Sequence, residues 1–160
     1  MQKQAELIER FNQARETMRE LLPAIDVHTE IYPGWTMKEV LSHLAGWDDS
    51  TVQALQIFAA GAPPLITAMR GVDFHNAQTV AERKELTYEQ VVREWEWVRE
   101  QLIPIIEQLS AKDLATSLVA PWGEKLTVLD ILTIMIEHEE EHAEIIRARI
   151  ENPSEPPQAH

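Results

Sequence analysis

The stretch VLDILTIMIEHEEEH, residues 128–142, decides the fold and carries the most informative chemistry of the chain. Its apolar residues recur every three or four positions, which is typical of a helix that buries one face. His138 and His142 continue that buried stripe, and four glutamates surround them on the other faces. A buried polar side chain needs a partner. Because residues four apart on a helix project from the same face, both imidazoles can reach one metal ion.

Three more amphipathic segments predict an all-α fold, a four-helix bundle. The first spans residues 2–22. The second and third each begin at a capping box, in which a hydroxyl and a carboxylate or amide satisfy the first free backbone N–H groups. These boxes are Thr36-Met-Lys-Glu39 and Thr87-Tyr-Glu-Gln90, and Thr127 caps the fourth helix, which is expected to end near residue 150.

A long crossover, residues 62–86, links helices 2 and 3 and is expected to contain a short helix near residues 74–84. Its length lets helices 2 and 3 run parallel, which predicts an up-down-down-up arrangement. No segment alternates as a strand would. We expect one domain over residues 1–151, followed by a disordered tail, residues 152–160, that is rich in proline and polar residues.

The composition is that of a globular protein, with 44% hydrophobic and 26% charged residues and no cysteine. No apolar stretch is long enough to cross a bilayer, and the N-terminus has no signal-peptide core, so we expect a cytoplasmic protein without a membrane partner. The formal net charge is −13, and the lysines and arginines are dispersed. Such a chain should repel phosphate backbones, which predicts no nucleic-acid partner.

His43 is the candidate for a third metal ligand. It lies seven residues after Thr36, about 10 Å along helix 2 at about 1.5 Å per residue. His142 lies eight residues before Ile150, about 12 Å from the end of helix 4 by the same rise. In antiparallel neighbouring helices these depths match, so the three imidazoles are expected to converge. Three nitrogen ligands with an open position are typical of a catalytic site and suit zinc, nickel or ferrous iron.

Other interpretations of the same residues have less support. His138-Glu-Glu-Glu-His142 matches the H-E-x-x-H pattern of zinc proteases, but the H-x-x-G-x-x-H continuation is missing and no strand is predicted to hold a peptide. Glu139-x-x-His142 matches half of a di-iron site, but no second copy exists. In the plainest alternative, the histidines are partly buried residues that bond to the backbone or to glutamates.

Three further residues are weak candidates near this site. Glu139 is a candidate general base, although a solvated glutamate in an acidic face is the more ordinary interpretation. Trp47 follows His43 by one helical turn and is expected to wall a substrate or cofactor pocket. Asp48 is a candidate polar group near the mouth of that pocket.

The stretch Trp35-Thr-Met-Lys-Glu-Val-Leu-Ser-His43-Leu-Ala-Gly-Trp47 resembles the helix 2 signature of the DinB-like (YfiT-like) metalloenzyme superfamily. Phe74-His-Asn76 and residues 91–114 resemble the middle of its ClbS/DfsB-like branch, and His138-x-x-x-His142 matches its helix 4 pair. The resemblance covers residues 7–150. It implies an up-down-down-up bundle with a divalent metal, often nickel or zinc, held by His43, His138 and His142. Homodimers are common in this superfamily, which makes a homodimer one expectation.

The resemblance also implies a function. Characterised relatives include transferases and isomerases that use a low-molecular-weight thiol, whose pKa the metal lowers. The ClbS-like branch includes a resistance protein that opens a reactive cyclopropane without the full triad. Because the triad is complete here, we expect a metal-dependent transferase or hydrolase acting on a small-molecule substrate, in thiol-dependent transfer or detoxification. The alternative is a non-catalytic or metal-free bundle, a small-molecule-binding or ClbS-like resistance protein. With ordinary histidine pKa values, metal occupancy is expected to fall below about pH 6.

Overall fold

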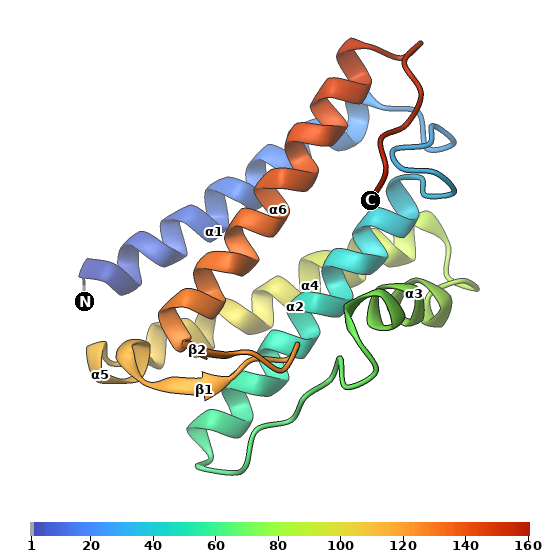
Figure 1. Cartoon of the computed structure of the whole chain (residues 1–160). Coiled ribbons are helices and arrows are strands. Elements are labelled where there is room, and N and C mark those ends of the chain that lie inside the picture. The colour runs from blue at the N-terminus through green and yellow to red at the C-terminus, as the bar shows by residue number, and fades with distance from the viewer. Residues whose placement is uncertain (1) are drawn as a thin grey trace.

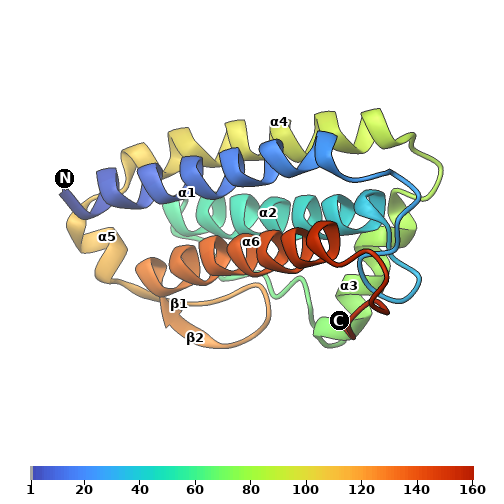
Figure 2. The ribbon, with the colours of Figure 1, turned by 90° about the horizontal axis from the view of Figure 1, so that it is seen from above.

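The structure, a computed structural model, describes residues 2–160 and is built on four long helices. These are α1 (Gln2–Leu21), α2 (Met37–Ala59), α4 (Tyr88–Gln108) and α6 (Val128–Glu151). α2 packs chiefly against α4, and α1 against α6. Figures 1 and 2 show α1 and α6 running in one direction and α2 and α4 in the other. The predicted all-α fold is confirmed, and the helix directions are those of an up-down-down-up bundle.

Shorter elements complete the chain. A 3-10 turn (Leu22–Ala24) follows α1, α3 (Val72–Glu82) lies in the long crossover, and α5 (Ala111–Ala115) follows α4. Strands β1 (Ser117–Val119) and β2 (Lys125–Thr127) pair antiparallel, with Leu118 opposite Leu126. The expectation of no strand is therefore wrong for this hairpin. Strands of three residues are too short for an alternating pattern to show in the sequence.

The capping residues start the helices where the sequence predicts. The Thr87 hydroxyl accepts from the backbone N–H of Gln90 at 3.2 Å, and the Gln90 amide oxygen accepts from the Thr87 N–H at 2.7 Å. The Glu39 carboxylate likewise accepts from the Thr36 N–H at 2.8 Å. Satisfying these N–H groups fixes the residue at which each helix begins. It therefore also fixes how far along α2 His43 lies.

The crossover helix α3 lies close to α2. A Cβ atom on Gly46 would come within 2.3 Å of the Thr79 methyl group, so only glycine permits this approach. α3 thereby reaches the middle of α2, next to Trp47. Within the crossover, α3 therefore packs against the bundle.

The apolar core consists of two clusters. One is built around Phe11, Leu102 and Leu132, and the other around Met18, Trp95 and Ile146. Four ionisable side chains occupy the level between the two clusters, and each of the four long helices contributes one. We call this group the ionic layer: Arg15 from α1, Asp48 from α2, Arg99 from α4 and Glu139 from α6.

Every member of the ionic layer is at least 95% buried. Arg15 donates to Glu139 at 2.9 Å and to Asp48 at 2.9 Å. Arg99 donates to Asp48 at 3.1 Å and also to Glu139. Two cations and two anions therefore alternate, and the layer carries no net charge. Buried charges are tolerated only when they are paired and hydrogen-bonded in this way.

The two guanidinium groups also bind the backbone. Arg15 donates to the carbonyl of Trp95 at 2.6 Å, and Arg99 to that of Phe11 at 3.0 Å. Burial by itself would raise the pKa of Glu139, but the charges of Arg99 and Arg15 outweigh burial and hold that pKa below its usual range. Glu139 is therefore a carboxylate at neutral pH, and the layer ties all four helices together.

Residues 152–160 lie beyond the end of α6. Two expectations stay predictions: a single domain over residues 1–151, and disorder in the tail that follows it. In the structure this segment turns back from the end of α6 toward the loop before α2 (Figure 1). Within residues 2–160 no helix is both long and apolar enough to cross a membrane.

We expect Arg99→Met to destabilise the protein by about 3–5 kcal/mol, because it leaves two buried carboxylates with one guanidinium. Arg10→Met is the matched control. Arg10 pairs with Glu140 at 3.4 Å on the surface, where each side chain is 44% exposed, and its loss should cost about 1 kcal/mol or less. Urea unfolding measures both free energies. Equal losses in the two variants would show that the ionic layer does not hold the bundle together.

Candidate metal centre

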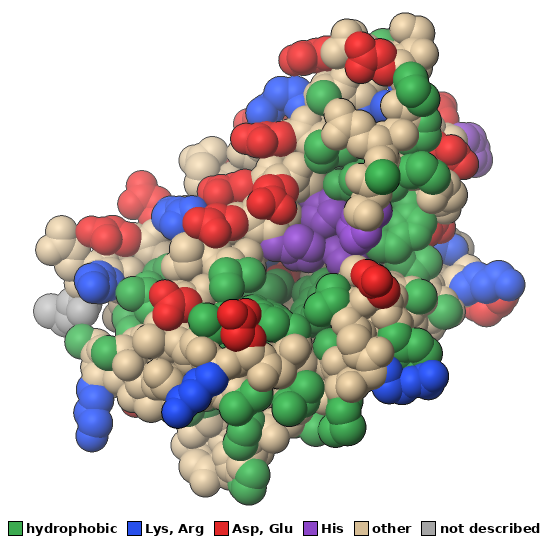
Figure 3. All heavy atoms as spheres, viewed as in Figure 1, with side chains coloured by type: hydrophobic (Ala, Val, Ile, Leu, Met, Phe, Trp, Pro, Cys, Tyr) green, Lys and Arg blue, Asp and Glu red, His purple; other side chains and the backbone are tan. Residues whose placement is uncertain are grey.

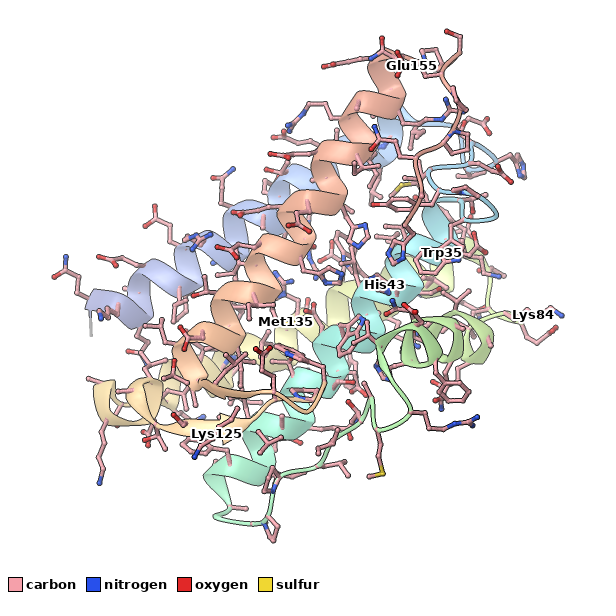
Figure 4. All side chains as sticks on the ribbon, in the orientation of Figure 1. Trp35, His43, Lys84, Lys125, Met135 and Glu155 are labelled. Atoms are coloured by element: carbon pink, nitrogen blue, oxygen red, sulfur yellow. The ribbon has the colours of Figure 1, made fainter. Side chains whose placement is uncertain are left out.

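The three predicted ligands come together between α2 and α6. α2 contributes His43, and α6 contributes His138 and His142. In Figure 4 His43 lies on α2 beside α6, with Trp35 on one side of it and Met135, nearer the start of α6, on the other. His43 is 1% exposed and His142 is 4% exposed. The matched depths expected from the sequence therefore correspond to the observed positions.

The imidazoles face one another through their Nε2 atoms. The Nε2 atoms of His43 and His138 are 2.8 Å apart, and those of His138 and His142 are 3.1 Å apart. Two bare nitrogen lone pairs repel each other, so each of these contacts needs a proton or a cation between the atoms. A tetrahedral zinc ion holds its nitrogen ligands about 3.3 Å apart, given Zn–N bonds of about 2.0–2.1 Å. The donor set therefore fits a divalent metal ion.

Tyr32 orients one of the three ligands. Its hydroxyl lies 2.6 Å from Nδ1 of His142. When His142 Nδ1 carries the proton it donates to Tyr32, which leaves Nε2 free to bind a metal. The Tyr32 backbone is held in turn by Trp35, whose N–H donates to the Tyr32 carbonyl at 2.8 Å. Nδ1 of His43, in contrast, is buried without a hydrogen-bond partner in the described structure.

Burial keeps these histidines neutral. It lowers the pKa of His138 to about 4, although the charge of Glu139 raises it somewhat. Burial and the neighbouring His138 lower the pKa of His142 to about 2. The pKa of His43 is lowered further, again chiefly by burial. Since only the neutral imidazole binds metal, the site is ready for a cation at neutral pH.

A cavity of about 600 Å³ opens beside the three histidines. Its apolar wall includes Trp47, Trp122 and Met135. Figure 3 shows the histidines gathered in a hollow of the surface, bordered by apolar and acidic side chains. A concave, mostly apolar site with a few convergent polar groups is typical of small-molecule binding.

Acidic residues of α6 line one side of the cavity. Glu137, Glu141 and Glu144 lie at helical spacing and all contribute to its lining. Their charges make this side attractive to cations. They also disfavour a strongly anionic ligand.

Trp47 is where the sequence predicts, in the wall of the cavity. Its indole N–H donates to the Asn76 amide oxygen at 2.8 Å, and its ring packs against His75 at 4.4 Å between centroids. Asn76 and His75 belong to α3, so the crossover helix holds Trp47 in position. A role for Trp47 in binding a substrate or cofactor stays a prediction.

Glu139 and Asp48 lie in the ionic layer and not in the cavity. The ordinary interpretation of Glu139, a solvated glutamate, is wrong, because this side chain is 1% exposed. It points inward because the buried face of α6 includes Glu139 and His142, with the half-buried His138 beside them. Asp48 is 2% exposed and does not line the mouth of the cavity. A catalytic role for either stays a prediction, and their bonds to Arg15 and Arg99 favour a structural role.

Two residues near the ligands were not anticipated, Tyr32 and His160. Tyr32 precedes Pro33-Gly34, a turn signal that indicated a loop but not where the loop packs. His160 lies nine residues beyond α6, yet it lines the cavity and its ring is 5.0 Å from that of His43. A group of His43, His142 and His160 able to hold a metal ion is present in the structure.

Solved structures share this fold. The colibactin self-resistance protein ClbS, crystallised in complex with a dsDNA, is similar over 92% of this chain and 95% of its own, with a TM-score of 0.77 and 16% identity. An uncharacterised protein from Escherichia coli UTI89 is similar over 96% and 95%, with a TM-score of 0.77 and 18% identity. A mycothiol-dependent maleylpyruvate isomerase is similar over 89% of this chain and 60% of its own, with a TM-score of 0.74 and 13% identity.

The prediction of no nucleic-acid partner, drawn from the net charge, was wrong. ClbS has this fold and was crystallised with dsDNA, so the fold is compatible with nucleic-acid binding. Net charge sums over the whole surface, whereas binding to a phosphate backbone depends on the local placement of basic groups. A total of −13 therefore does not exclude that class of partner.

Sequence comparison identifies the family. No relative with a curated function matches the chain significantly. The sequence pattern of the DinB superfamily (DinB_2) matches residues 10–146, which include His43, His138 and His142. The resemblance seen in the helix 2 signature and the helix 4 histidine pair is confirmed, and the chain belongs to the DinB superfamily.

Proposed function

We propose that this protein binds a divalent metal ion through His43, His138 and His142 and acts on a small molecule held in the adjacent cavity. The observation that carries the proposal is the convergence of three Nε2 atoms, two of whose separations are 2.8 and 3.1 Å. Three imidazole ligands suit nickel, zinc or ferrous iron. Three protein ligands leave a coordination position for a further ligand.

The surrounding residues have separate tasks in this proposal. Tyr32 holds His142 in the orientation that directs Nε2 at the ion. Trp47, fixed by Asn76, forms an apolar wall for the substrate. The ionic layer sets the rotation of α2 and α6 through Asp48 and Glu139, which keeps the three ligands in register. Ligands held by packed supporting residues are a requirement for a working metal site.

A divalent ion in this site would supply Lewis-acid chemistry, lowering the pKa of a water molecule or thiol that it binds. We propose a transferase or hydrolase of detoxification type, with a low-molecular-weight thiol as co-substrate. The likeness to a mycothiol-dependent maleylpyruvate isomerase supports thiol use. The apolar wall and the acidic side of the cavity favour a neutral or cationic apolar substrate.

A second candidate is a metal-free protein that binds or resists a small molecule. The observation that favours it is the likeness to ClbS, a self-resistance protein, over 95% of that protein's length. In this case the histidines would be structural, and the cavity alone would provide the function. Metal content separates the two candidates directly.

Elemental analysis is the first measurement. We expect on the order of one equivalent of nickel, zinc or iron in the purified, untagged protein. The variant His43→Ala/His138→Ala/His142→Ala should contain less than about a tenth of that, because all three nitrogen ligands are gone. His28→Ala, which alters an exposed histidine in a loop, is the control and should keep the metal. Circular dichroism checks that each variant is folded.

Either of two results would contradict the metal proposal. One is a wild-type protein that takes up no metal even after incubation with nickel or zinc. The other is a folded triple variant that retains its full metal content. Both would favour the metal-free candidate.

Metal affinity should change little with pH from about 8 to 5 and fall as the pH approaches 4. The ordinary histidine pKa predicts a loss below about pH 6, but burial lowers the pKa of His138 to about 4 and that of His142 to about 2. A lowered pKa keeps the imidazole neutral in more acid solution, so protons compete with metal only there. Competition with a chromophoric chelator at each pH, over the range in which the protein stays folded, measures this. Half-loss near pH 6.5 would show that burial does not protect the ligands.

A further inference from the structure

His160 brings a fourth imidazole into the metal centre. Its ring lies 4.5 Å from that of Trp35, 4.9 Å from that of Tyr32 and 5.0 Å from that of His43, measured between centroids. It also stacks almost parallel on His142, at 5.5 Å and 14°. The imidazole is thus surrounded by rings on several sides and lines the cavity. His160 itself remains exposed, so its imidazole lies at the open side of the site, against these rings.

The fourth imidazole is within reach of the ion that the triad would bind. One potential ligand atom from each of His43, His142 and His160 lies within 4.8 Å of the other two. His138 is not a member of that group, although its Nε2 atom lies 2.8 Å from that of His43 and 3.1 Å from that of His142. His160 is therefore placed to serve as a further ligand of an ion that His43 and His142 would hold.

The chain leading to His160 is anchored at its base. Arg149 on α6 donates to the carbonyl of Glu30 at 2.9 Å, to that of Pro153 at 2.9 Å and to that of Glu155. One guanidinium thus joins α6, the loop before α2 and the returning segment. Three backbone carbonyls on a single side chain hold the turn that sends the segment back along the bundle.

Beyond this anchor two prolines stiffen the segment. Pro156 and Pro157 line a small recess together with Ile31, Ile145 and Arg149. Proline fixes its own φ angle and restricts the residue before it, so the segment loses less entropy on docking than a flexible one would. The last residues can nonetheless leave, because no hydrogen bond from Gln158, Ala159 or His160 to the rest of the described chain is present.

We propose that His160 is a detachable fourth ligand, which fills the coordination position left open by His43, His138 and His142 until a substrate or thiol displaces it. This inference rests on the proposed metal site. It assigns residues 152–160 a role as a tethered internal ligand. The metal centre would then have a closed state with four imidazoles and an open state with three.

If His160 occupies the open coordination position, an external ligand must compete with it for the metal. A ligand on a short tether has an effective concentration in the millimolar range. The apparent dissociation constant of that external ligand rises by the inverse of the fraction of open sites. Removing His160 should therefore lower the affinity for the metal and raise the affinity for an added ligand at the same time. A side chain that only packs against the histidines would not give these opposite effects.

The test uses the full chain loaded with Co²⁺, whose visible absorption reports the ligands of the ion. We expect His160→Ala to change the absorption spectrum and to lower Co²⁺ affinity by about tenfold or more. Added imidazole should restore the wild-type spectrum. 2-Mercaptoethanol should bind the Co²⁺-loaded variant about tenfold more tightly than the loaded wild type. His28→Ala, in an exposed loop, is the matched control and should match the wild type in all of these measurements.

Arg149→Ala provides a second variant that keeps the imidazole but loosens its anchor. We expect it to bind 2-mercaptoethanol with an affinity between those of the wild type and His160→Ala. Identical spectra and thiol affinities in wild type and His160→Ala would overturn the fourth-ligand proposal while leaving the triad intact. A wild type that binds no Co²⁺ would overturn both proposals, and the triple histidine variant identifies the triad as the site of any Co²⁺ that is bound.

Discussion

The ionic layer is the interaction on which the rest of the structure depends. Arg15, Asp48, Arg99 and Glu139 come from four different helices and are buried between the two apolar clusters. Apolar contacts tolerate small rotations of a helix, whereas paired buried charges do not, because a lost partner leaves an uncompensated charge. Asp48 therefore fixes the rotation of α2, and Glu139 that of α6. The metal centre depends directly on this restraint, since it takes ligands from these two helices.

The centre itself is a group of neutral imidazoles in a poorly solvated place. Burial depresses the pKa values of His138 and His142, so the site carries almost no positive charge of its own at neutral pH. Glutamates of α6 add negative charge at the side of the cavity. Both features favour a cation. The net charge of −13 gave a wrong expectation about nucleic acid, because net charge does not describe the local surface on which a partner docks.

Several segments of the chain line the approach to the centre. On one side the cavity wall is made by Trp47 and Trp122, with Trp47 held by Asn76 of α3. On the other side residues 152–160 return from α6 and bring His160 beside the ligands, guided by the Arg149 anchor. Segments outside the four long helices thus shape the space around the metal centre: the crossover, the loop before α2, the turn between β1 and β2, and the returning segment. α2 and α6 supply the three ligands, and the connecting segments determine what else can approach.

The sequence by itself determined the helices, their starting residues and the three histidines as candidate ligands, because helical period and capping chemistry are local. It also determined the family, through the helix 2 signature and the helix 4 pair. Only the tertiary structure decided that Glu139 is buried in an ion cluster, that Tyr32 supports His142 and that His160 reaches the centre. These contacts join residues more than 15 positions apart, up to 124 in the pair of Arg15 and Glu139. No local pattern encodes them, because burial depends on how the helices pack and not on their order in the chain.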